Sequence, residues 1–112
     1  YNSRKMEKLF SMIQRVCFQG HTHVAGVFAS DLSFQRPEEF GFRLQLKDEK
    51  VMINVGSVGQ PRDGDWRSCY VIMEENMVHF RRVEYDVGST VQRIYDIPDL
   101  DNNLGDRLRD GR

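Results

Sequence analysis

Two histidines separated by one residue are the side chains in this sequence best suited to chemistry. His21 and His23 lie in the segment Gly20-His21-Thr22-His23, directly after a short apolar stretch. Imidazole is the commonest metal ligand near neutral pH, because it is largely neutral there and offers a nitrogen lone pair. Gly20 allows the sharp backbone turn that a loop needs at a strand end. The segment is a candidate metal site, although two surface histidines without a metal would have the same pattern.

A glycine-containing segment later in the chain could bind an anion. It spans residues 54–67 and follows a second apolar stretch. Gly56 allows a ligand to approach main-chain N–H groups, and Asn54 and Ser57 add short polar side chains. Arg62 could bind a phosphate through two parallel hydrogen bonds. A long turn without a ligand is the alternative interpretation of this segment.

The elements that precede these two segments explain how they could come together. Residues 15–19 and residues 51–53 are apolar and are predicted to be buried strands, the second of them central in its sheet. Adjacent strands of one sheet would bring both following loops to the same edge. A metal site beside an anion site is what phosphoester chemistry requires.

The remaining pattern predicts a helix, a run of strands and then more helices, which indicates the α+β class. Residues 2–14 are predicted to be a helix with one apolar stripe of Met6, Leu9, Phe10 and Ile13. Further strands are predicted over 24–29, 42–47, 69–73 and 77–85, with 30–41 mostly loop and 69–73 buried. Asp86 is a plausible cap for a helix over 87–95, and Pro98 is predicted to start a last helix that stops at Gly111.

Composition excludes several classes of partner. The 112 residues are 39% hydrophobic and 29% charged, with a formal net charge of -1, which is ordinary for a globular protein. No basic excess favours nucleic acid, and no apolar run reaches the roughly 20 residues of a membrane helix. The first residues are polar, so no signal peptide is expected. Cys17 and Cys69 lie outside any CxxC pair and are predicted to be buried free thiols in the cytoplasm.

The two candidate loops, taken together and in this order, resemble a known family. Residues 18–28, which contain GHTH, and residues 52–65, which contain NVGSVGQPRDGD, closely resemble the calcineurin-like metallophosphoesterases. Residues 80–86 resemble the small bacterial phosphodiesterase branch of that superfamily. The resemblance covers about 16–112, and the two motifs in order are specific where either alone would be weak.

The resemblance implies a fold, two metals and a reaction. The expected fold is the C-terminal half of a two-sheet metallophosphatase-type α/β sandwich, with mostly antiparallel strands and flanking helices. His21 would serve one metal and His23 the other, and two divalent ions would activate a hydroxide for attack on phosphorus. The ions would be of the Mn, Fe, Zn or Ni type. Asn54, Gly56, Ser57 and Arg62 match the family's loop beside this site and are candidates for phosphate binding.

The family's other metal-binding motifs, of the forms DxH, GDxxD and GNHE/D, are absent from this sequence. Asp48, Asp63 and Asp65 stand in the wrong contexts to replace them. The chain also begins with Tyr1 rather than methionine, in a segment that resembles a protein interior. We therefore expect 1–112 to be a single partial domain, the C-terminal part of a phosphodiesterase or phosphatase. No catalytic residue is assignable in it alone, and the isolated chain is expected to be inactive.

Two alternatives remain at this stage. The chain could be a non-catalytic remnant that acts as a binding or oligomerisation module, or one half of a split enzyme whose other half is a separate chain. The expected partners are a phosphoester substrate of the complete enzyme and either a second copy of the chain or the missing N-terminal half. The sequence does not specify the substrate or the metals.

Overall fold

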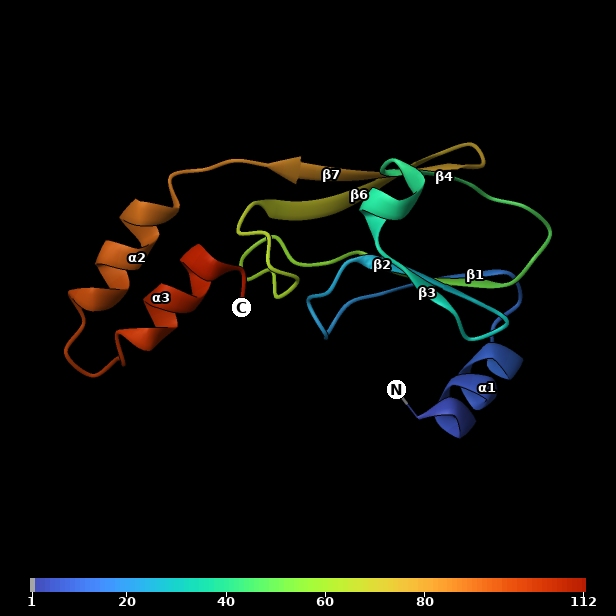
Figure 1. The fold of residues 1–112 in the computed structure, drawn as a ribbon, viewed down its shortest axis with the longest axis horizontal. Coiled ribbons are helices and arrows are strands. Elements are labelled where there is room, and N and C mark those ends of the chain that lie inside the picture. Colours follow the sequence, from blue (N-terminus) through green and yellow to red (C-terminus); the bar gives the residue numbers. More distant parts are fainter. Residues whose placement is uncertain (1) are drawn as a thin grey trace.

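The computed structural model describes residues 2–112, which form a layered α+β structure with two sheets (Figure 1). Sheet A has the strand order β1 (Val16–Gln19), β5 (Val51–Asn54), β2 (Gly26–Ala29) and β3 (Phe34–Gln35). Sheet B has the order β4 (Arg43–Gln45), β7 (Met77–Val83) and β6 (Ser68–Glu74). All strand pairs are antiparallel except β1 with β5. The predicted fold class is confirmed.

The parallel pair of β1 and β5 decides where the candidate loops lie. Val16 is opposite Val51 and Gln19 is opposite Asn54, so the two strands end at the same level. β5 lies between β1 and β2, as its apolar sequence predicted. The segments that follow Gln19 and Asn54 therefore leave the sheet side by side.

The main core lies between the two sheets. It contains Val27 and Ile53 from sheet A and Val78 and Phe80 from sheet B, together with Ala25, Leu46 and Cys69. Ile53 and Val78 are fully buried, and burying such a side chain contributes about 1.5–3 kcal/mol relative to leaving it exposed. This core fixes the two sheets relative to each other, and so fixes the loops at their edge.

The helix α1 (Ser3–Met12) covers the opposite face of sheet A. Asn2 caps it, since its side-chain oxygen accepts a hydrogen bond from the Lys5 N–H at 3.3 Å. Met6 and Phe10 on its apolar stripe pack against Phe28 and Met52 of the sheet. The predicted helix and stripe are confirmed, with the helix ending two residues earlier than expected.

Several sequence-based predictions need correction. The segment 30–41, which was expected to be mostly loop, contains β3 and a 3-10 helix, Pro37–Phe40. β2 begins at Gly26 rather than at residue 24, because the preceding residues belong to the histidine segment. The last helix, α3 (Asn103–Asp110), does not start at Pro98. The Asp101 carboxylate accepts from the Asn103 N–H at 2.8 Å, so the chain turns there and leaves Leu100 outside the helix.

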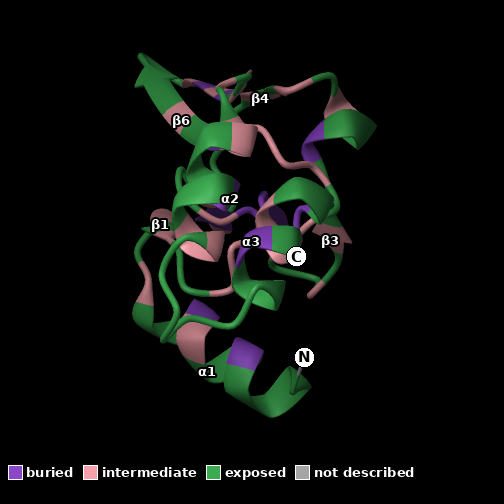
Figure 2. Cartoon of the chain, turned by 90° about the vertical axis from the view of Figure 1, so that its left-hand side faces the viewer, coloured by how far each residue is buried: buried purple, intermediate pink, exposed green. Residues whose placement is uncertain are grey.

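Sheet B is less covered than its sequence suggested. Residues 69–73 were predicted to be a buried strand, but Tyr70, Ile72 and Met73 are 40%, 42% and 48% exposed. Figure 2 shows that much of β6 is exposed. Only one face of sheet B packs on sheet A, and no described element covers the other.

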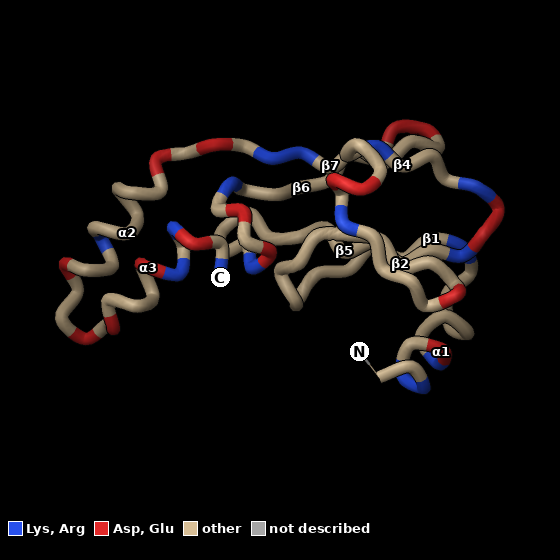
Figure 3. Tube along the Cα trace, viewed as in Figure 1, with Lys and Arg blue, Asp and Glu red and all other residues tan. Residues whose placement is uncertain are grey.

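The helices α2 (Val87–Tyr95) and α3 pack on each other and form an arm beside the two sheets (Figure 1). Asp86 caps α2 as predicted, accepting from the Ser89 N–H at 3.1 Å. Acidic residues are spread along this arm, and Arg81 and Arg82 are adjacent near the end of β7 (Figure 3). None of the helices within 2–112 is long and apolar enough to span a membrane.

Both cysteines are free thiols, with Cys69 buried and Cys17 partly buried.

Candidate metal and phosphate site

Two loops form the candidate site, and backbone hydrogen bonds join them. The histidine loop comprises residues 20–25, and the glycine loop comprises residues 55–67. The Val55 N–H donates to the Gln19 carbonyl at 2.9 Å, and the Arg62 N–H donates to the His23 carbonyl at 3.0 Å. The structure thus brings the two segments together at one sheet edge, as the sequence predicted.

Asn54 ties both loops to the end of β5. Its side chain is 1% exposed, and its amide nitrogen donates to the Gly20 carbonyl at 3.1 Å and to the Thr22 hydroxyl at 2.8 Å. Its amide oxygen accepts from the Gly56 N–H at 3.0 Å. Since the amide group has two N–H donors, both are used within the protein. In this arrangement Asn54 holds the loops in place.

His23 is oriented by the glycine loop. Its Nδ1 lies 2.8 Å from the carbonyl oxygen of Gln60. A carbonyl can only accept, so Nδ1 carries the proton of this hydrogen bond and Nε2 keeps its lone pair when the ring is neutral. Metal-binding histidines usually donate their second ring nitrogen to a carbonyl or carboxylate in this way. The His23 ring is therefore held in the form that binds a metal through Nε2.

The backbone of the histidine loop is unusual at both histidines. His21 has φ 76° and His23 has φ 61°, in the left-handed region that residues other than glycine seldom adopt. Such conformations cost about 1–3 kcal/mol each and persist where surrounding contacts hold them. His21 is exposed and His23 is partly buried. The loop is thus a strained turn that presents two imidazoles at its surface.

The first part of the glycine loop packs closely on the histidine loop. Gly56 has φ 76°, and a Cβ there would lie 2.8 Å from the Cys69 sulfur and 3.1 Å from the Ala25 Cβ. The Ser57 hydroxyl accepts from the Gln60 N–H at 2.9 Å, which shapes the turn that presents the Gln60 carbonyl to His23. Burial raises the pKa of the Cys69 thiol to about 11, so this thiol stays protonated near neutral pH.

Arg62 is the exposed cation of the glycine loop. Its guanidinium donates to the Gln60 side-chain oxygen at 3.2 Å, and no carboxylate of residues 2–112 lies within ion-pair distance. Arg67, in contrast, is paired with Asp65 at 2.7 Å, and this hydrogen bond lowers the pKa of the Asp65 carboxyl. The Arg62 guanidinium therefore has no carboxylate partner among the described residues, and it is available to bind an anion.

A buried ion pair supports the loop from beneath, and the sequence analysis missed it. Asp63 and Arg82 form a salt bridge with side chains 1% and 4% exposed, and the same carboxylate accepts from the Ala25 N–H at 3.4 Å. Arg82 follows Val78 and Phe80 at two-residue spacing on β7, which places it on the core-facing side. The two-residue spacing of Val78, Phe80 and Arg82 would have allowed a buried arginine to be predicted from the sequence.

The imidazoles fit a divalent metal, but they do not complete its coordination. Neutral imidazole nitrogen suits several first-row ions. Within residues 2–112, no group of three or more His, Cys, Asp or Glu side chains is placed to hold a metal ion. His21 and His23 are therefore at most part of a ligand set.

Comparisons with known proteins bear on the fold of the chain. No family model matches the chain. The chain is 37% identical over 99 residues to an uncharacterized protein of Methanocaldococcus jannaschii, an alignment that covers 85% of this chain and 39% of that protein. A crystal structure of a metallophosphoesterase from Sphaerobacter thermophilus is 35% identical and superposes with a TM-score of 0.88. That match covers 100% of this chain and 48% of the other, so the chain has the fold of about half a metallophosphoesterase.

Proposed function

We propose that this chain is the C-terminal part of a metal-dependent phosphoesterase, in which His21 and His23 bind the metals. The observation that carries the proposal is the hydrogen bond from His23 Nδ1 to the Gln60 carbonyl, 2.8 Å long, which leaves Nε2 free for a metal. The match to a metallophosphoesterase over the whole chain supports the reaction class. The small bacterial phosphodiesterase branch is the proposed subfamily, on the strength of the two motifs.

The residues of this chain have distinct roles in the proposed reaction. His21 and His23 would each hold one of two divalent ions, and such ions would supply an activated water and neutralise charge on the phosphate. Arg62 binds a phosphate oxygen, since it is exposed and has no carboxylate partner in the described chain. Asn54, Gly56 and Ser57 shape the wall beside the phosphate. Water attacks phosphorus, the ester P–O bond breaks, and the alcohol leaves with a proton.

The remaining metal ligands come, in this proposal, from the part of the parent protein that lies outside these 112 residues. Two imidazoles without a bridging carboxylate bind two divalent ions weakly, so the chain alone is expected to be inactive. The free thiols Cys17 and Cys69 support a reducing compartment, and we place the parent protein in the cytoplasm.

Hydrolysis of bis(4-nitrophenyl) phosphate by the full-length parent protein with Mn²⁺ tests the proposal. We expect His21→Ala and His23→Ala to lower the rate more than about 100-fold, because loss of outer-shell partners alone costs about 10- to 100-fold. His79→Ala is the matched control, since His79 lies on β7 opposite Ile72, outside the two loops.

Hydrolysis of the same diester should also be measured with the isolated chain. It should hydrolyse the diester no faster than its own His21→Ala, His23→Ala double variant. A metal-dependent rate well above that of the double variant would contradict the incomplete ligand set, and full activity of His23→Ala in the parent protein would contradict the site.

A further inference from the structure

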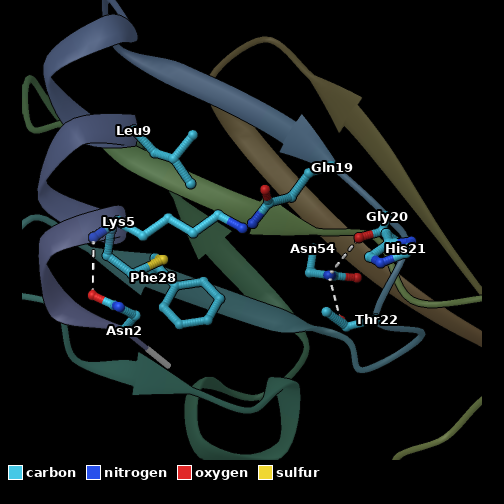
Figure 4. A pocket seen from close by; sticks show the side chains of 10 residues that line it. Asn2, Lys5, Leu9, Gln19, Gly20, His21, Thr22, Phe28 and Asn54 are labelled. Carbon is cyan, nitrogen blue, oxygen red and sulfur yellow. Dashed lines mark hydrogen bonds between the residues drawn. The ribbon is translucent and has the colours of Figure 1, made fainter.

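The side chain of Gln60 has no role in the function proposed above, although Gln60 contacts several parts of the site. On the sheet side, Asn54 fixes the histidine loop through hydrogen bonds to Gly20 and Thr22, which are drawn in Figure 4. Gln60 makes a separate set of contacts. Its main-chain carbonyl orients the His23 ring, and this contact does not use the side chain.

The side-chain amide of Gln60 bridges Arg62 and the end of the helical arm. Its Oε1 accepts from the Arg62 guanidinium at 3.2 Å, and its Nε2 donates to the main-chain oxygen of Arg112 at 3.1 Å. Turning the amide over would set donor against donor and acceptor against acceptor, so the two contacts define its orientation. Gln60 is partly buried, whereas Arg62 is exposed.

The main-chain oxygen of Arg112 is a fixed anchor, because the end of the arm packs closely on the glycine loop (Figure 1). The Gly64 N–H donates to the Gly111 carbonyl at 3.0 Å, and the Arg112 N–H donates to the Arg107 carbonyl at 2.9 Å. Gly111 has φ 66°, and a Cβ there would lie 2.6 Å from the Asp65 main-chain nitrogen. The oxygen that holds Gln60 is therefore tied to α3 and to the glycine loop.

Gln60 orients the Arg62 guanidinium without neutralising its charge. A long exposed side chain loses conformational entropy when it binds an anion, and holding it beforehand reduces that loss. The amide oxygen is a neutral acceptor that uses one guanidinium N–H group, and a guanidinium has several more for an anion. Arg67 has instead a carboxylate partner, Asp65, at 2.7 Å, which offsets its charge.

We propose that the Gln60 side chain is a positioning residue, which holds the Arg62 guanidinium for the phosphate and is itself anchored on the end of the arm. The proposal rests on the proposed function, in which Arg62 binds a phosphate oxygen. Gln60 acts through Arg62 and does not touch the substrate. The arm of α2 and α3 is thereby connected to phosphate binding through a single side chain.

Kinetics of the full-length protein with bis(4-nitrophenyl) phosphate test this role. Gln60→Met keeps the length of the side chain and the carbonyl that orients His23, but it removes both side-chain hydrogen bonds. We expect KM to rise about fivefold, because one hydrogen bond that orients the guanidinium is lost. The value of kcat and the metal content measured by elemental analysis should change little, because the affected contact is a binding contact.

Gln60→Glu is a second variant with a sharper expectation. Its carboxylate would pair with Arg62 and place a negative charge beside the phosphate, so KM should rise at least about tenfold. Gln14→Met is the matched control, because Gln14 is exposed and lies between α1 and β1, at the end of β1 opposite the histidine loop. It should leave KM unchanged.

A double-mutant cycle distinguishes positioning of Arg62 from a general structural role. In an Arg62→Met background, Gln60→Met should raise KM no further, because the group that it positions is already absent. A merely structural contribution of Gln60 would give the same rise in both backgrounds. That result, or an unchanged KM in Gln60→Met, would overturn the proposal.

Binding of inorganic phosphate to the metal-free full-length protein separates this inference from the proposed function. NMR spectra should show a saturable shift of the Arg62 Nε–H signal, with a Kd about fivefold weaker in Gln60→Met and unchanged in Gln14→Met. This result together with no hydrolysis would contradict the phosphoesterase function and retain the role of Gln60. No shift of the Arg62 signal, or equal Kd values for Gln60→Met and the unaltered protein, would overturn that role, whatever the activity.

Discussion

At the scale of single residues, the Asp63–Arg82 pair is a buried salt bridge beneath the site. Both side chains are buried, and Asp63 Oδ1 and Arg82 Nε have no hydrogen-bond partner within the described residues. Arg82 Nε lies 3.6 Å from the Asp65 carboxylate, which adds a weaker ionic contact. Because the Asp63 carboxylate also accepts from the Ala25 N–H, the pair connects β7 to the histidine loop.

Arg82→Met should destabilise the chain by about 3–5 kcal/mol, because it leaves the Asp63 carboxylate buried without its counter-ion. Urea unfolding measures the change in the free energy of unfolding. Arg81→Met is the matched control. Its side chain is exposed and forms no salt bridge with residues 2–112, so a change within about 0.5 kcal/mol is expected. Similar losses for the two variants would contradict the role of the buried pair.

At the scale of elements, the close contact between the glycine loop and β6 depends on the absence of a side chain at Gly56. Its φ of 76° and the 2.8 Å approach to the Cys69 sulfur leave no room for a Cβ. Gly59, three residues later in the same loop, has nothing within 4 Å of an added Cβ. The two glycines therefore form a natural pair for comparison.

Gly56→Ala should lower the free energy of unfolding by about 1–3 kcal/mol, through backbone strain and contact with Cys69. Gly59→Ala should be neutral or slightly stabilising, by up to about 1 kcal/mol, because it restricts the unfolded chain without new contacts. Thermal unfolding of the two variants side by side measures the difference. If Gly56→Ala proved as stable as Gly59→Ala, the packing of the two loops would differ from that described.

The sequence predicted the elements that hold the site better than the contacts within it. Short apolar stretches located β1 and β5, and strand adjacency then placed the two loops together. The hydrogen bond between His23 and Gln60 could not be predicted, because a backbone carbonyl 37 residues away has no signature in residue type. The start of α3 was missed because the Asp101 side chain, and not Pro98, sets the turn that precedes it.

At the scale of the whole molecule, the chain is extended for its length. Its radius of gyration is 16.1 Å, whereas a compact domain of this size has about 13 Å. The arm of α2 and α3 accounts for part of the extension. The outer face of sheet B is a separate feature, an exposed apolar surface. Tyr70, Ile72 and Val83 are 40%, 42% and 45% exposed there, and the strand register places them on the same face.

We expect the isolated chain to associate into a dimer or larger oligomer at micromolar concentration, because exposed apolar patches of this kind tend to be buried by a partner. Light scattering gives the mass. Ile72→Lys should shift the chain towards monomer if sheet B forms the contact, while Met12→Lys tests α1, where Met12 is 71% exposed. A well-folded monomer of the unaltered chain would contradict this expectation and favour an independent module.

Elemental analysis of the purified full-length protein tests the metal site most directly. The proposed site holds about two divalent ions per chain. His23→Ala should lower the metal content by at least about one ion, since it removes the Nε2 that the Gln60 hydrogen bond leaves free. His79→Ala should keep the full content. Full metal occupancy in His23→Ala, with the protein still folded, would contradict the assignment of this loop as a metal site.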